Sequence, residues 1–125
     1  MSLLLKSSLT FYIEDSTQTP TECFRKVYSD TTGIAITEYK AETIVIATAT
    51  NTELDFGGVA SAMGVFVRVD KACTYSLDTG TPGADVNPLP INAWFFIKSP
   101  TASGLVNITL TTSTTDTTVD FFVAG

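Results

Sequence analysis

The sequence contains no histidine, and this absence narrows the chemistry open to the protein. Histidine is the commonest general base at neutral pH and the commonest transition-metal ligand. A serine or cysteine nucleophile in this chain would therefore lack its usual base. The only close carboxylate pairs, Glu14–Asp15 and Glu53–Asp55, are typical of solvated strand ends. We expect no catalytic residues and no enzymatic activity.

A metal or cofactor site is not expected either. Asp78, Asp85 and Asn87 offer the oxygen ligands that calcium prefers. However, the regular ligand spacing of a calcium-binding loop is absent, and Asp and Asn are also common turn residues. The sequence therefore predicts no bound metal and no cofactor.

Charge is scarce and of the wrong sign for a nucleic-acid partner. Charged residues make up 16% of the chain, and the formal net charge is −6. Binding to a phosphate backbone needs clustered Lys and Arg, but only Arg25 and Lys26 are adjacent among the seven basic residues. No apolar run is long enough to cross a bilayer. Neither nucleic acid nor a membrane is an expected partner.

The chain has only two cysteines, Cys23 and Cys73. Its start, MSLLLKSS, places Lys6 after three leucines, whereas a secretory signal places its charge before a longer apolar stretch. We therefore expect synthesis in a reducing cytoplasm, where both cysteines remain free thiols.

Residues that favour β-structure are abundant. About one residue in six is threonine, whose branched β-carbon favours extended backbone. Apolar and polar residues alternate with period two in short runs bounded by turn residues. The runs are LTFYI, CFRKVY, IAIT, TIVIATATN, MGVFVRVD, ACTYSL, AWFFIK, LVNITLTT and TTVDFFVA. They predict one all-β domain over residues 1–125, an antiparallel sandwich or barrel of about eight strands.

Two connections between these runs carry specific expectations. The segment 78–90, DTGTPGADVNPLP, contains three prolines and two glycines, which predict a long loop or an irregular edge. The segment STTD, 113–116, is predicted to be the hairpin turn between the last two strands. In the last strand, Val119, Phe121 and Val123 are expected to face the core.

The aromatic run at 94–96 is a candidate contact surface. Neighbours along a strand point in opposite directions, so Trp94 and Phe96 share one side and Phe95 takes the other. One side is expected in the core and the other at an interface, which makes Trp94 a candidate partner contact. Alternatively, Trp94, Tyr75 or Tyr28 would serve as a stacking ring in a carbohydrate-binding module.

The leucines Leu3, Leu4 and Leu5 are also candidate partner contacts. Because they are consecutive, strand geometry sends them to both faces, and burying all three requires cover on two sides. We expect a short N-terminal arm, residues 1–7, to leave the sandwich and pack on a neighbouring chain. The alternative is an arm folded wholly onto its own domain.

The second half of the chain resembles a known family in the order of its predicted strands and in the kinds of residues that each segment contains. From GVFVRVDKACTYSLDTG through VNPLPINAWFFIKSP to LVNITLTTSTTDTTVDFFVAG, it is similar to small jelly-roll structural proteins of tailed bacteriophages. Those proteins likewise run from a strand and short hairpin through a proline-containing segment and an aromatic strand to a closing apolar strand. Within that group it looks most like the capsid cement or decoration proteins.

The resemblance implies an antiparallel β-sandwich of jelly-roll type and a place on the capsid exterior of a virion. It implies as partners the major capsid protein and copies of the chain itself, as a homo-oligomer. The family offers no diagnostic residues to carry over. A phage tail or host-attachment component, and a carbohydrate-binding β-sandwich module, remain as alternatives.

Overall fold

The computed structural model of the chain describes residues 3–14, 17, 19, 22–78, 86–98, 105–112 and 114–125. These residues contain twelve strands and no helix. The strands are β1 (Leu3–Leu5), β2 (Ser8–Glu14), β3 (Glu22–Ser29), β4 (Ile34–Ile36), β5 (Tyr39–Ile46), β6 (Asn51–Glu53), β7 (Gly64–Val69), β8 (Cys73–Asp78), β9 (Val86–Ile91), β10 (Trp94–Lys98), β11 (Asn107–Thr111) and β12 (Thr117–Ala124).

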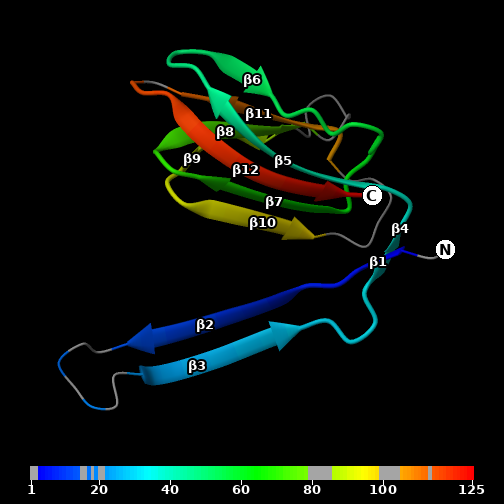
Figure 1. Cartoon of the computed structure of the whole chain (residues 1–125), viewed down its shortest axis with the longest axis vertical. Helices are drawn as coiled ribbons and strands as arrows, with labels where there is room; N and C mark the ends of the chain where they lie inside the picture. Colours follow the sequence, from blue (N-terminus) through cyan, green and yellow to red (C-terminus); the bar gives the residue numbers. More distant parts are fainter. Residues whose placement is uncertain are drawn as a thin grey trace.

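Strands β5 to β12 form two four-stranded sheets, with the orders β10-β7-β12-β5 and β6-β11-β8-β9. Every strand pair in them is antiparallel. The two sheets are layered in Figure 1, as in a sandwich. The prediction of an all-β, antiparallel protein is confirmed. The described residues hold more strands than the eight or so expected, because β1 to β4 lie outside these two sheets.

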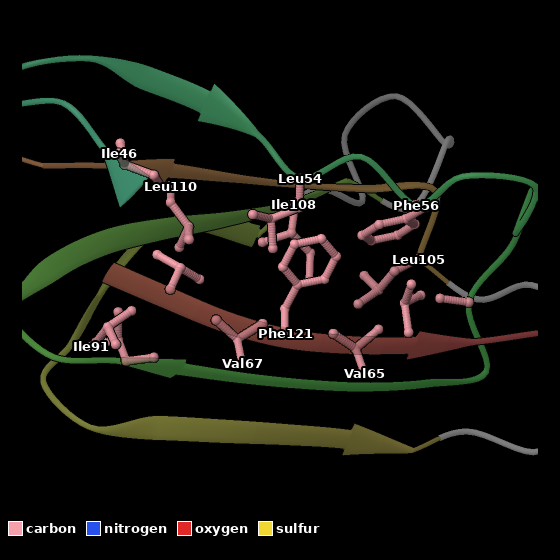
Figure 2. Packing of buried hydrophobic residues seen from close by; sticks show 14 of the residues in the cluster. Ile46, Leu54, Phe56, Val65, Val67, Ile91, Leu105, Ile108, Leu110 and Phe121 are labelled. Atoms are coloured by element: carbon pink, nitrogen blue, oxygen red, sulfur yellow. The ribbon is translucent and has the colours of Figure 1, made fainter. Parts of the chain in front are cut away.

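The core lies between the two sheets, where alternation along each strand sends one set of side chains inward. Val65 and Val67 of β7 and Phe121 of β12 point toward Ile108 and Leu110 of β11 (Figure 2). The predicted inward face of β12 is confirmed, because its alternate residues from 119 to 123 are buried. All members of this core cluster fall between residues 46 and 123.

The predicted closing hairpin is wrong. Strand β11 pairs with β6 and β8, whereas β12 pairs with β5 and β7, so the last two strands lie in different sheets. The physical reason is that both strands carry one fully apolar face. Ile108 and Leu110 pack against Val119 and Phe121 across the sandwich interior, which two strands side by side in one sheet could not do.

The proline-rich segment ends in an edge strand. Strand β9 begins at Val86 and pairs only with β8 among the described strands, with a register shift between Tyr75 and Leu77. Proline lacks the N–H that a central strand needs, so Pro88 and Pro90 fit this edge position. The expectation of an irregular edge is confirmed here, while residues 79–85 lie outside the described residues.

Strands β2 and β3 form a separate two-stranded ribbon, which we call the hairpin. Their register runs from Ser8 opposite Ser29 to Glu14 opposite Glu22. In Figure 1 this ribbon extends beyond β10 and stands clear of both four-stranded sheets. It joins them through the short antiparallel pair β1 and β4. The element that projects is therefore 8–29.

Candidate interaction surface

The two faces of the hairpin differ in composition. Alternation and register place five large apolar or aromatic side chains on one face, together with one charge. This apolar face consists of Leu9, Phe11, Ile13, Phe24, Lys26 and Tyr28. The opposite face carries fewer large apolar side chains: Tyr12 and Val27 are exposed there beside Thr10 and Arg25. The hairpin is thus an amphipathic ribbon, the pattern of a strand pair that packs one face against a partner.

The apolar face is open to solvent in the single chain. Phe11, Ile13, Phe24 and Tyr28 are each between 48% and 62% exposed. The ring of Phe11 meets that of Tyr28 edge to face, with centroids 6.1 Å apart. The Lys26 ammonium lies 5.7 Å from the Tyr28 ring centroid. These contacts stay within the hairpin, and a contiguous apolar surface of this kind marks an interaction site.

A polar cluster fixes the base of the hairpin to the sandwich. Lys98, at the end of β10, forms an ion pair with Asp30, and its side chain is only 14% exposed. The Lys98 ammonium also donates a 3.2 Å hydrogen bond to the Ser7 hydroxyl. The Ser7 hydroxyl in turn donates to the Asp30 carboxylate at 2.8 Å, and the Asp30 amide donates to the Ser7 carbonyl at 3.0 Å. One lysine therefore holds both ends of the hairpin.

Replacing Lys98 with Met is expected to loosen the hairpin without unfolding the sandwich. The change removes the ammonium group that donates to the Asp30 carboxylate. A hydrogen bond to a charged group contributes about 1.5–3 kcal/mol to stability. Hydrogen exchange of the β2 and β3 amides should accelerate roughly tenfold or more, since about 1.4 kcal/mol is a factor of ten. Lys71→Met, which removes an ammonium from the exposed Asp116 carbonyl, is the matched control. Equal exchange in the two variants would contradict the role of Lys98.

The outer face of the β10-β7-β12-β5 sheet is a second candidate surface. Its register aligns Phe96, Phe66 and Phe122 in one row across three strands. The next row places Trp94 beside Arg68 and Asp120. The Trp94 ring is 6.0 Å from that of Phe66, and Tyr39 lies 6.3 Å from Phe122. We call the side chains of these two rows, with Tyr39, the aromatic outer face.

An ion pair crosses this face. The Arg68 guanidinium donates two hydrogen bonds to one oxygen of the Asp120 carboxylate, one of them from Nε at 3.1 Å. The Thr43 hydroxyl donates to the other oxygen at 2.5 Å. The Thr43 hydroxyl and then Arg68 hold the pKa of Asp120 below its usual value. The backbone amide and hydroxyl of Thr48 lower the pKa of Asp116 in the same way.

These lowered pKa values predict acid sensitivity. A carboxylate whose pKa is lower in the folded state stabilises that state above its usual pKa of about 3.9. This stabilisation is lost as the pH falls through the pKa that the carboxyl group has in the folded state. The melting temperature should therefore decline below about pH 4. In Asp120→Asn the decline should be shallower, because that residue no longer takes up a proton. Melting curves between about pH 2 and 6 measure this, and parallel profiles would contradict it.

The structure separates the three leucines that the sequence grouped. Strand β1 pairs with β4, and Leu5 is 8% exposed while Leu4 is 53% exposed. Leu5 packs on Gly64, where an added Cβ would collide with the Leu5 Cδ2 atom. Leu3 is half-buried. In the described part of the chain, Leu5 thus belongs to its own domain, and Leu4 is the leucine open to a partner.

The aromatic candidates are placed differently from one another. Trp94 is 46% exposed on the aromatic outer face, whereas Phe95 stacks on Tyr75 at 4.4 Å and packs against the core. One face of the Tyr75 ring is therefore covered by Phe95, and Tyr28 lies on the hairpin. Sequence reasoning gave no role to Phe11, Ile13 and Phe24. The only signal in the sequence is the alternation of 9–13, which predicts a strand with one apolar face but not what covers that face.

The described residues contain no group of three His, Cys, Asp or Glu side chains that could hold a metal ion. Asp85 lies outside the described residues, as does the side chain of Asn87.

Cys73 is a free, buried cysteine, and burial raises the pKa of its thiol. The Cys23 side chain lies outside the described residues. A search of the described residues for a membrane-spanning helix finds none.

No protein-family model matches this chain, and neither a curated protein nor a solved structure matches it.

Proposed function

We propose that this chain is a virion structural protein that decorates the exterior of a capsid, where it binds the major capsid protein and copies of itself. The observation that carries the proposal is the apolar face of the hairpin, which the described part of its own chain leaves uncovered. A two-stranded hairpin alone is marginally stable in water. It gains stability when a partner covers its apolar face, and this requirement fits a part that functions only in an assembly.

The connectivity supports a jelly-roll interpretation of the sandwich. Among β5 to β12, the first strand pairs with the last, β6 with β11, β7 with β10 and β8 with β9. This nested pairing is that of one long hairpin with β8 and β9 at its tip, rolled so that the other consecutive strands alternate between the two sheets. Jelly rolls are common in viral capsid proteins and in lectins. The second half of the chain resembles phage decoration proteins, and this resemblance favours a capsid protein over a lectin.

Particles released by cells that carry this coding sequence provide the test. We expect the chain in purified particles by mass spectrometry, and density for it on the outside of the shell in a cryo-electron-microscopy map. Absence from the particles would contradict the proposal. Density confined to the tail would also contradict it, and would support a tail or host-attachment component instead.

Carbohydrate binding is a second candidate, favoured by the aromatic outer face. Trp94 and Phe66 lie next to the Arg68–Asp120 ion pair, so ring faces and hydrogen-bonding groups are adjacent, as sugar recognition requires. A glycan array tests this directly. Binding that Trp94→Ala removes would support the second candidate, whereas an array without signal would contradict it.

A further inference from the structure

We propose that the apolar face of the hairpin docks on the aromatic outer face of a second copy of this chain, and that the second copy returns the same contact. The product is a two-fold dimer in which the copies exchange hairpins. The inference deepens the proposed function and rests on it only for the premise that the chain acts as an assembled part.

The shape of the hairpin determines the kind of contact. Phe11, Ile13 and Phe24 lie on one face, so a partner has to cover that face rather than add a strand to an edge. Strand addition would satisfy the free backbone groups of β2 or β3 but leave these three side chains in water. The occupant is therefore a flat apolar surface, such as the outside of a sheet.

The aromatic outer face is such a surface, and the chain already packs on part of it. Gly64, Phe66 and Phe122 follow the same outward alternation, and Leu5 of β1 covers the Gly64 end. The Phe row continues from this point and is only half-buried. Trp94 and Tyr39, at its two sides, are more exposed. An apolar segment that approaches next to Leu5 would extend an existing contact.

The charges on the two surfaces are complementary. Lys26 is the one charged residue in the apolar face of the hairpin. The outer side of the sheet carries Asp70 and Asp120 near Arg68. A second cation on this side, Lys98, is already paired with Asp30. A hairpin packed on another hairpin would instead bring two Lys26 side chains to one interface, and the described side chains of that face include no carboxylate to neutralise them. The charge pattern therefore favours the sheet over a second hairpin.

The available area is sufficient for a stable dimer. Aromatic side chains bury about 150–250 Å² each, and four half-exposed large side chains with Leu9 and Lys26 offer roughly 400–500 Å² per hairpin. With a similar area on the receiving sheet and the contact made twice, about 1,600–2,000 Å² is buried. This is the size of a standard specific interface.

The way the hairpin is attached favours contact with a second copy. It makes folding of the hairpin back onto the β10-β7-β12-β5 sheet of its own chain less favourable. Lys98 pins Ser7 and Asp30 at the end of β10, which is the edge strand of that sheet. From there the hairpin leads away past the edge, so it does not cover the aromatic outer face of its own chain (Figure 1). A second copy can reach that face without breaking the Lys98 cluster.

Analytical ultracentrifugation of the full chain and two variants tests the proposal. Phe11→Thr with Ile13→Thr keeps β-forming residues but removes two apolar contacts, and should weaken dimerisation about 100-fold, equivalent to about 2.7 kcal/mol. Tyr12→Thr, on the opposite face of the same strand and equally exposed, is the matched control and should change it less than threefold. A wild-type chain that stays monomeric at all concentrations would overturn the proposal, as would equal effects of the two variants.

Cross-linking identifies the receiving surface and keeps the proposal testable if the double variant fails to fold. A photoreactive phenylalanine analogue at position 13, in a mixture of ¹⁴N- and ¹⁵N-labelled chains, should yield mixed-isotope cross-links to 39–46, 94–98 or 117–124. Cross-links to 8–29 of the other copy, or within one copy, would overturn the proposal. Particle binding by a monomeric chain would overturn the exchange of hairpins but leave decoration of the capsid standing, so the two failures are distinguishable.

Discussion

Deletion of residues 8–29 is expected to leave a folded sandwich that no longer associates. All members of the core cluster fall between residues 46 and 123, so the deletion removes none of them. The ends to be joined are already adjacent, because the Asp30 amide donates to the Ser7 carbonyl at 3.0 Å. A two-residue Asn-Gly turn can therefore close the gap. The melting temperature should change by only a few degrees, whereas self-association and particle binding should be lost entirely.

Two measurements on the deletion variant check this expectation. Circular dichroism and thermal melting report on the sandwich, and sedimentation reports on association. The full-length Tyr12→Thr chain is the control, because it changes an exposed aromatic residue of the same hairpin but keeps the apolar face. A deletion variant that is unfolded would show that the hairpin stabilises its own domain. One that associates as the wild type does would show that the hairpin is not the contact.

Leu110→Ala is expected to cause a large loss of stability. Leu110 of β11 is 0% exposed and lies within the layer between the sheets (Figure 2). Truncating a buried leucine removes its transfer free energy and leaves a cavity, which together cost about 2–5 kcal/mol. For a domain of this size the melting temperature should fall by about 10 °C or more.

Leu4→Ala is the matched control, because the same atoms are removed from a side chain that is half exposed. Its free energy of unfolding should change by less than about 1 kcal/mol, as for most surface substitutions. Urea denaturation of both variants gives the comparison. Similar destabilisation by the two substitutions would show that β11 does not lie in the core.

The candidate contacts were partly accessible from the sequence. Trp94 was predicted at an interface, and alternation alone gave its orientation relative to Phe95. Leu4 and Leu5 were treated alike, because a sequence does not reveal which of two faces meets the sheet. The hairpin residues Phe11, Ile13 and Phe24 were missed for the same reason. Their pattern is that of any half-buried strand, and only the position of β2 and β3 beyond β10 leaves it uncovered.

The amino-acid sequence by itself determined the local structure: extended backbone, period-two alternation and the inward side of strands such as β7 and β12. These properties depend on β-branching and on the geometry of neighbouring residues, which act over a few positions. The tertiary structure alone decided which strands pair. Pairing β5 with β12 joins residues up to 85 positions apart, and it depends on burying two apolar faces against each other. For the same reason the final two strands lie in opposite sheets, and the hairpin is left without cover.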